Sequence, residues 1–262
     1  MRQYAEKLGR ATVSGLEELG YALSLFVESF YWIFFGYRRG QSVSIAATFK
    51  QMMQVGVAAI PISAALSFAV GIMLAIQGIH TLKAFGAESQ VVVGIALSVT
   101  REFAPLIIGI LIAGRSGSAI AARVGTMQVS QEIDALQVIG ISPVRYLVAP
   151  ALLAMMVMVP TLTFFADIVG MLGGAFFSVL ELNISMEAYV DRTIKALTVD
   201  DILQGIWKSI VFAIIIAVVG FINGFSVTGG AEGVGKATTR SVVQAISLII
   251  VADMAFTFYL NH

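Results

Sequence analysis

Residues 51–82 contain no charged side chain, and this long apolar stretch is the feature that most restricts the fold. A helix of about 20 apolar residues crosses the hydrocarbon core of a bilayer, so the stretch can span a membrane with some tilt. Charged residues make up 12% of the chain and hydrophobic residues 58%, whereas a soluble domain has about 25% charged residues. A soluble fold could not bury this much apolar surface. The chain is therefore predicted to be a polytopic, all-α membrane protein.

Five membrane spans are predicted from the apolar runs. They cover residues 51–78, 91–122, 146–180, 209–231 and 241–260. The polar segment 181–201 separates the third span from the fourth, and we expect it to hold a short helix on the outer side of the membrane. We interpret residues 1–45 as a cytoplasmic end with an interfacial helix and residues 46–262 as the five-span core, together forming a single domain over 1–262.

Basic residues near the span ends indicate the orientation, because cytoplasmic loops carry an excess of Lys and Arg. The first 50 residues contain six basic residues, and the loop at Lys83 contains one. Segment 115–145 contains three, and segment 181–208 contains three against five acidic residues. The last loop holds Lys236 and Arg240. This alternation predicts a cytoplasmic N-terminus and a C-terminus outside.

Residues 16–36 are long enough to form a sixth span, but their pattern favours a helix that lies at the membrane interface. Polar residues recur at spacings of three and four along one helical face, namely Ser14, Glu17, Tyr21, Ser24 and Glu28. Aromatic residues crowd the end of the segment, from Phe30 to Tyr37. A polar stripe of this kind is typical of an interfacial helix. A plain span is the alternative, and it would place the N-terminus and its basic residues outside.

Five charged residues interrupt the predicted spans: Arg115 lies near the end of the second span, and the other four are candidates for a functional site. Arg101 and Glu102 lie near the middle of the second apolar run, where an ionised group costs about 2.5–3.5 kcal/mol. Consecutive residues point about 100° apart on a helix, so these two side chains are expected to face different partners. Pro105, one turn later, would weaken the local hydrogen bonding and could kink the helix. Asp167 and Asp253 are the other intramembrane candidates, and all four either line a substrate path or only hold the helices together.

Residues 129–139 predict a short amphipathic helix on the cytoplasmic side, between the second and third spans. Its apolar face consists of Val129, Ile133, Leu136 and Ile139, which lie at helical spacing. Ser130 is expected to cap the start. Glu132 and Asp134 fall in the first turn, where the helix dipole favours acidic groups. Gly140 and Pro143 are expected to end the helix.

Residues 230–237 nearly match the phosphate-binding loop G-x-x-x-x-G-K-[ST], but Ala237 stands where a hydroxyl must bind magnesium. We interpret this segment as a flexible cytoplasmic turn that does not bind nucleotide. Cysteine is absent, and His80 lies far from His262, so no metal site is expected. The zero net charge gives no indication of nucleic-acid binding. The sequence contains neither an H-E-x-x-H nor a G-x-S-x-G motif, so nothing in it suggests a membrane enzyme.

Two long sequence runs carry a family resemblance. Ala113 opens the run A-G-R-S-G-S-A-I-A-A-R-V-G-T-M, and Gln131 opens Q-E-I-D-A-L-Q-V-I-G-I-S-P-V-R-Y-L-V-A-P. Together with T-R-E-F-A-P at 100–105, G-K-A-T-T-R at 235–240 and Asp253, they resemble the MlaE-type permease family over roughly residues 45–260. Members of this family are membrane subunits of ABC transporters that move lipids between the membranes of double-membraned bacteria and plastids.

The resemblance implies a homodimeric permease of the bacterial inner membrane without ATPase activity of its own. Two cytoplasmic ATPases would bind ATP and Mg²⁺ and would meet a coupling helix formed by Glu132, Ile133, Asp134, Ala135 and Leu136. A periplasmic ring of MCE-domain proteins and a small cytoplasmic accessory subunit are the other expected partners. Phospholipid would occupy an outward-facing cavity between the two copies. Arg101 and Glu102 match the family's charged pair close to that cavity, and Arg240 is a further charged candidate.

Two positions depart from the family pattern. Arg123 stands where many members carry an acid, and Ala151 stands where many carry arginine, so contacts near the cytoplasmic side are not carried over. Two other functional classes stay open. A proton-coupled secondary transporter would use Glu102, Asp167 and Asp253 as a relay, although no evident inverted repeat supports it. A membrane scaffold would only anchor its partners.

Overall fold

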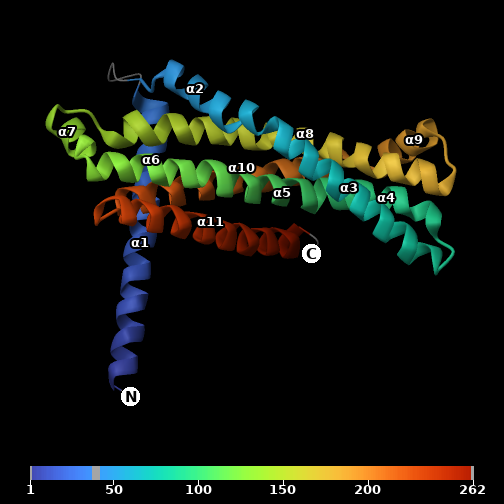
Figure 1. Ribbon diagram of the computed structural model, residues 1–262, viewed down its shortest axis with the longest axis horizontal. Helices are drawn as coiled ribbons and strands as arrows, with labels where there is room; N and C mark the ends of the chain where they lie inside the picture. The colour runs from blue at the N-terminus through green and yellow to red at the C-terminus, as the bar shows by residue number, and fades with distance from the viewer. Residues whose placement is uncertain (1, 37–41, 261–262) are drawn as a thin grey trace. The chain divides into compact units, whose positions relative to one another are not determined.

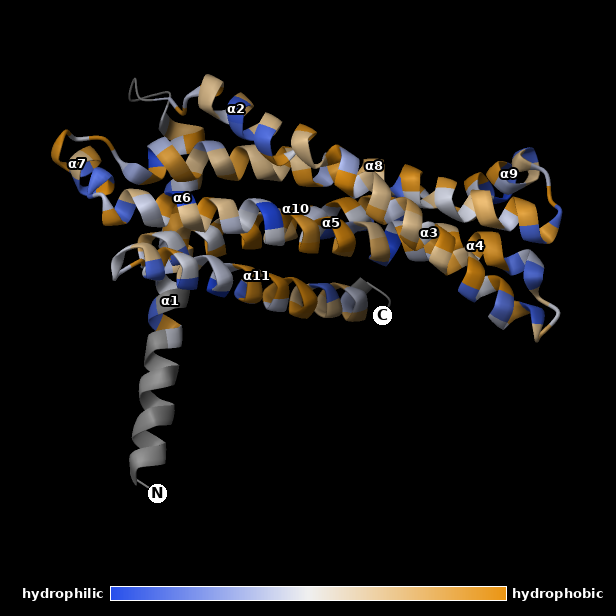
Figure 2. Ribbon diagram, in the orientation of Figure 1, coloured by the Kyte–Doolittle hydropathy of each residue, from blue (hydrophilic) through white to orange (hydrophobic). Residues whose placement is uncertain are grey.

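The computed structural model describes the backbone of residues 2–36 and 42–260, and the side chains of residues 15–17, 20–36 and 42–259. Every regular element in these ranges is helical (Figure 1). Five stretches are long and apolar enough to cross a membrane: Ile45–Lys83, Glu88–Val129, Val144–Leu182, Val199–Phe225 and Gly230–Tyr259. Orange, hydrophobic residues dominate these stretches in Figure 2. The prediction of an all-α membrane protein with five candidate spans is therefore confirmed.

The first three candidate spans consist of several helical pieces each. The first contains α2 (Ile45–Val55), the 3-10 turn η2 (Val57–Ala59) and α3 (Ile60–Lys83). The second contains η3 (Glu88–Gln90), α4 (Val91–Ser98), η4 (Val99–Phe103), α5 (Ala104–Ile112), η5 (Ala113–Gly117) and α6 (Ser118–Val129). The third contains η6 (Val144–Val148) and α8 (Ala149–Leu182). The segments η4, η5 and η6 are π-helical, a rare form that often marks functional positions.

The remaining elements are α1 (Arg2–Phe35), α7 (Glu132–Val138), α9 (Met186–Ala196), α10 (Val199–Phe225) and α11 (Gly230–Leu260). The chain packs as two compact units. Unit 1 comprises Met1–Gln51, Arg115–Ala154 and Ile215–Ala245. Unit 2 comprises Met52–Gly114, Met155–Ile214 and Ile246–His262.

In unit 2, α3 and α8 approach each other through small residues. A methyl group added to Gly71 would lie 1.9 Å from the carbonyl oxygen of Gly170, and one added to Gly173 would lie 2.2 Å from that of Phe68. Small residues allow membrane helices to pack at backbone contact. Contacts of this closeness fix the position of α8 against α3 within the unit.

The short helix α9, also in unit 2, confirms that the polar segment between the third and fourth spans is partly helical. The Ser185 hydroxyl caps the helix by accepting a hydrogen bond from the Ala188 N–H at 3.1 Å. The Tyr189 hydroxyl donates to the Met171 carbonyl oxygen at 3.2 Å. Burial raises the pKa of Tyr189 to about 12, so the hydroxyl keeps its proton at physiological pH. Tyr189 thus anchors α9 to α8.

In unit 1, the C-terminal half of α1 packs against the start of the third span. The Glu28 carboxylate accepts hydrogen bonds from Trp32 Nε1 at 3.1 Å and from the Ser142 hydroxyl at 3.2 Å. The Arg145 guanidinium lies over the Trp32 ring, 5.6 Å from its centroid. Within the described residues α1 is not one of the candidate spans. Some of the residues used to predict an interfacial helix here lie outside the described part of the chain. They are Tyr37, the side chain of Ser14 and the basic side chains before Lys50.

Three local predictions were wrong. The glycine-rich residues 230–237 are helical and open α11; the turn comes earlier, at residues 226–229, where Gly229 adopts a φ of +85°. Ser130 does not cap α7: Gln131 occupies that position with a φ of +60°, and the Ser130 hydroxyl instead donates to Glu132 Oε1 at 2.9 Å. The fourth span lies about six to ten residues earlier than predicted, so Lys208 is inside it.

Candidate functional site

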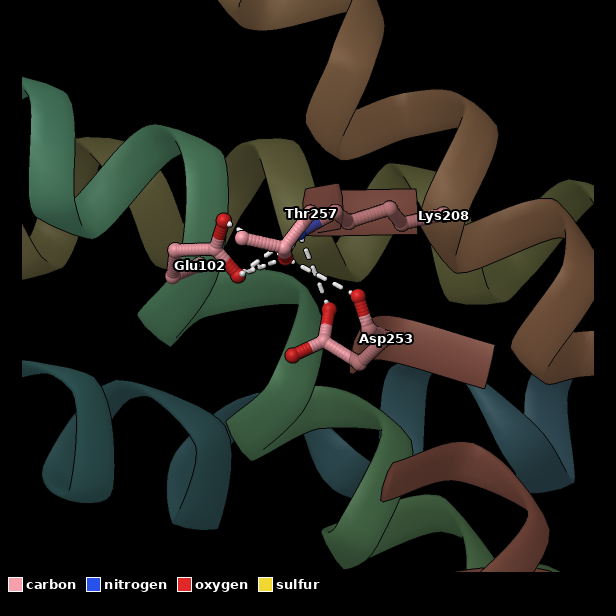
Figure 3. Close-up of polar contacts among 4 residues, drawn as sticks. All are labelled: Glu102, Lys208, Asp253 and Thr257. Atoms are coloured by element: carbon pink, nitrogen blue, oxygen red, sulfur yellow. Dashed lines mark hydrogen bonds and ion pairs between the residues drawn. The ribbon is translucent and has the colours of Figure 1, made fainter. Parts of the chain in front are cut away.

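A fully buried lysine organises a polar cluster within the helices of unit 2 (Figure 3). The side chain of Lys208, on α10, has 0% of its surface exposed. Its ammonium donates to Glu102 Oε2 at 2.6 Å and to the Thr257 hydroxyl at 3.1 Å, and it forms an ion pair with Asp253 Oδ1 at 3.0 Å. The ammonium thus makes two hydrogen bonds, to Glu102 and Thr257, and lies at ion-pair distance from Asp253. We call these four residues the Lys208 cluster.

Thr257 ties the fifth span into the Lys208 cluster. Its hydroxyl lies 3.1 and 3.2 Å from the two Glu102 carboxylate oxygens and 2.9 Å from the Asp253 carbonyl oxygen. Asp253 and Thr257 are one helical turn apart on α11, so they present their polar groups on the same face. The cluster therefore joins the second, fourth and fifth spans through side chains alone.

A second ion pair lies at the start of α10. Arg101 Nε donates to Asp201 Oδ1 at 2.6 Å, and a guanidinium nitrogen of the same residue lies 2.5 Å from that oxygen. The other Asp201 oxygen accepts from the Thr198 N–H at 2.7 Å and from the Thr198 hydroxyl at 2.8 Å. The Asp201 N–H in turn reaches the Thr198 hydroxyl at 3.4 Å. This reciprocal arrangement is a capping box, and it holds Asp201 in place for Arg101.

The two ion pairs lie on one face of α10. Asp201 and Lys208 are seven residues apart, which is close to two helical turns. Their partners, Arg101 and Glu102, are consecutive residues of the π-helical segment η4. The expectation that these neighbours face different partners is confirmed. A π-helical turn widens the backbone locally, and it ends two residues before Pro105, which cannot donate a backbone hydrogen bond.

Gly205 allows α10 to reach η4. It lies between Asp201 and Lys208 in the sequence, and a methyl group added to it would lie 2.5 Å from the Thr100 carbonyl oxygen. Such a contact is too short for any side chain. The glycine therefore sets the close approach that brings both ion pairs into hydrogen-bonding range.

The Lys208 cluster carries a net negative charge if both carboxyl groups are ionised, because one ammonium faces Glu102 and Asp253. Removing a single partner from a buried ion pair costs about 3–5 kcal/mol, since the remaining charge is left uncompensated. The cluster therefore stabilises the contact of the three spans only while it is intact. A metal ion has no evident place here: among the described residues no group of three or more His, Asp or Glu side chains could hold one.

The other candidate residues lie apart from this cluster. Asp167 on α8 is 2% exposed, its Oδ1 atom has no hydrogen-bond partner, and it forms no ion pair with a described residue. Arg240 is exposed on α11, in unit 1. In α7, Ile133 is buried and Leu136 half-buried, whereas Glu132, Asp134 and Ala135 are exposed.

Three residues of the site were missed from the sequence. Lys208 was placed at the edge of the predicted fourth span, Asp201 was assigned to the polar segment before it, and Thr257 is uncharged. The spacing of Asp201 and Lys208 is the signal that could have identified them. Residues seven positions apart lie on the same face of a helix, and this face carries one charge of each sign.

The family model described as permease MlaE matches residues 48–259. The chain belongs to the MlaE permease family. A probable ABC transporter permease protein of Rickettsia typhi is 34% identical over 208 residues, covering 79% of this chain and 80% of the relative. The intermembrane phospholipid transport system permease protein MlaE of Haemophilus influenzae is 30% identical over 209 residues, covering 79% and 80%.

A plant protein is also similar. TRIGALACTOSYLDIACYLGLYCEROL 1, a chloroplastic protein of Arabidopsis thaliana, is 36% identical over 212 residues, covering 81% of this chain and 61% of that protein. The chain is thus an MlaE-type ABC transporter permease with several apolar membrane helices. Of its two departures from the family pattern, Ala151 is buried. Arg123 faces Gln51. With the Gln51 amide oriented so that its oxygen faces the guanidinium, this oxygen accepts a hydrogen bond from Arg123 Nη2 at 2.9 Å.

Proposed function

We propose that the chain is the membrane subunit of an ABC transporter that moves phospholipid between the inner and outer membranes. ATP hydrolysis on a separate subunit would drive it, with Mg²⁺ and ATP bound there. The observation that carries this proposal is family membership over residues 48–259, together with the name of the Haemophilus relative, an intermembrane phospholipid transport permease. The chain itself does not hydrolyse ATP.

The coupling contact is assigned to α7. Ile133 is buried and anchors the helix, while Val138 and Ile139 at its end are 86% and 68% exposed. Glu132 and Asp134 lie in the first turn on the exposed side. Exposed apolar residues beside acidic ones suit a protein partner rather than water. The proposed partner is a cytoplasmic ATPase dimer, one subunit for each permease of a homodimer.

The Lys208 cluster is proposed to transmit that motion to the lipid path. It joins the second, fourth and fifth spans through Glu102, Lys208 and Asp253, so these spans move together while it is intact. Asp253 and Glu102 serve in conformational coupling, and Arg101 fixes the start of α10. Asp167 is proposed to contribute to the substrate path, and Arg240 is retained as a charged candidate.

The topology and partners follow the same proposal. The chain acts as one permease domain in the bacterial inner membrane, with α1 at the interface, the N-terminus in the cytoplasm and the C-terminus in the periplasm. A periplasmic ring of MCE-domain proteins receives or delivers the phospholipid. A small cytoplasmic accessory subunit completes the set of partners.

The test is to purify the native complex and to identify its proteins and lipids by mass spectrometry. An ATP-binding subunit and phospholipid are expected to co-purify. Reconstituted complex should transfer phospholipid when ATP is added and stop when ATP is replaced by a non-hydrolysable analogue. Transport by this chain alone, driven by a proton gradient without ATP, would instead establish the secondary transporter that uses Glu102, Asp167 and Asp253.

A further inference from the structure

A second charged site lies in unit 2, where the connection between α3 and η3 faces the connection between α8 and α9. It is a pocket of about 340 Å³. Its charged lining consists of Lys83, Glu88, Glu181 and Arg192. None of these four side chains forms an ion pair or a side-chain hydrogen bond with another described residue. Two cations and two carboxylates thus share one pocket without neutralising each other directly.

The walls of this pocket are fixed by local structure. Its apolar lining includes Ile79, which is buried at the end of α3, and Ile184, which packs with Tyr189. Asn183 ends α8 with a φ of +53°, a left-handed conformation that asparagine tolerates. Tyr189 holds α9, which carries Arg192, against α8. The pocket is therefore a preformed feature of unit 2.

The charges of the pocket select a particular chemical class. Lys83 and Arg192 can bind an anionic phosphodiester, since both are donors without acceptors. Glu88 and Glu181 can bind an ammonium group. A zwitterionic headgroup satisfies both pairs, whereas an anionic headgroup satisfies the cations and is repelled by the carboxylates. The pocket's net charge of zero points to the zwitterion.

The surroundings suit a molecule with acyl chains. Phe85, two residues after Lys83, is 79% exposed, and Leu180, next to Glu181, is 65% exposed. Exposed apolar side chains beside charged ones are typical of the boundary between hydrocarbon and headgroups. From Val91 to Arg101 the second span rises by about 15 Å, at 1.5 Å per residue. The pocket is therefore a different site from the Lys208 cluster, which lies deeper along the span.

We propose that the pocket lined by Lys83, Glu88, Glu181 and Arg192 binds the headgroup of a zwitterionic, ethanolamine-type phospholipid. Phosphate lies against Lys83 and Arg192, and the amine lies against the two glutamates. This inference rests on the proposed function, because it assigns a lipid-binding step to the outer end of the proposed transport path. It makes headgroup charge the property by which the permease distinguishes lipids.

The test uses the full chain in nanodiscs that contain equal amounts of phosphatidylethanolamine and phosphatidylglycerol, with bound lipid measured by native mass spectrometry. The variant Glu88→Gln with Glu181→Gln removes the amine contacts and leaves the cations. The ratio of bound phosphatidylglycerol to phosphatidylethanolamine is expected to rise about tenfold, which corresponds to about 1.4 kcal/mol shared between the two lost charge contacts. The matched control, Glu187→Gln with Asp191→Asn, removes the same charge from α9 outside the pocket and should leave the ratio unchanged.

Three outcomes would overturn the proposal. The first is an equal ratio in the pocket variant and the control. The second is loss of a co-purifying periplasmic protein from the pocket variant with an unchanged lipid ratio, which would make the pocket a protein contact. The third is displacement of bound lipid by soluble glycerophosphoethanolamine at the same concentration as is needed with the intact lipid. That result would identify a free phosphodiester as the ligand. Thermal unfolding of both variants checks that each is folded.

The transport assay separates this proposal from the function on which it rests. If the reconstituted complex transfers phospholipid on ATP addition and the pocket variant keeps the wild-type lipid ratio, the pocket assignment fails and the function stands. If the complex transfers no phospholipid, the proposed function fails, and the binding ratio still decides whether the pocket recognises a zwitterionic headgroup.

Discussion

Replacing Lys208 by methionine tests whether the buried ammonium holds three spans together. Methionine keeps the length and apolar stem of the side chain but leaves Glu102 and Asp253 facing each other, so the cluster changes from one excess negative charge to two. Breaking a buried ion pair costs about 3–5 kcal/mol. For a chain of this size each kcal/mol lowers Tm by about 2–4 °C. We therefore expect Lys208→Met to lower the unfolding temperature by about 6–20 °C.

The measurement is thermal unfolding in detergent, followed by intrinsic fluorescence, because Trp207 adjoins Lys208 and the chain contains two tryptophans. The triple variant Lys208→Met, Glu102→Gln, Asp253→Asn removes all three charges. It should recover most of the loss, since a buried ion pair replaced by neutral groups of similar size is often neutral for stability. Lys195→Met is the control: its exposed pair with Asp191 contributes at most about 0.5 kcal/mol. A triple variant no more stable than Lys208→Met would refute the reasoning.

Three further substitutions probe the same unit. Gly205→Ala forces a methyl group against the η4 backbone at 2.5 Å and should cost about 1–3 kcal/mol in thermal unfolding; an unchanged Tm would show that α10 can shift freely. Arg101→Met should cost less than Lys208→Met, because Asp201 keeps its cap on α10, and equal losses would contradict that ranking. Tyr189→Phe removes the hydrogen bond to Met171 and should cost about 1 kcal/mol, with faster hydrogen exchange confined to α9; exchange that rises throughout unit 2 would contradict a local anchor.

The sequence predicted most of the membrane architecture because long charge-free runs have few alternatives to a span. Five apolar runs became five candidate spans, and the polar segment before α10 contains the expected short helix. Span boundaries were less reliable where they were drawn at charged residues. Lys208 directly precedes the predicted fourth span, yet it lies well inside α10, where Glu102 and Asp253 compensate its charge.

The site could be predicted only in part for a related reason. Asp253, Arg101 and Glu102 stood out as charges within apolar runs, and the structure brings all three to α10. Their partners were invisible, because sequence spacing reports on one helix and not on which helices meet. The π-helical turn at η4 was equally unpredictable. It depends on tertiary contacts, among them the approach allowed by Gly205, and leaves no fixed pattern in the sequence.

The order of charges along the two helices makes the contact between η4 and α10 specific for one register. Arg101 pairs with Asp201, and Glu102 pairs with Lys208. If α10 slid by two turns so that Asp201 came opposite Glu102, two carboxylates would meet in a membrane and Lys208 would lose its partner. The first effect is repulsive and the second leaves a buried charge, so the observed register is strongly favoured over this one. We therefore expect the second and fourth spans to move as one body during transport at this level, and disulfide cross-links engineered between them should leave lipid transfer intact.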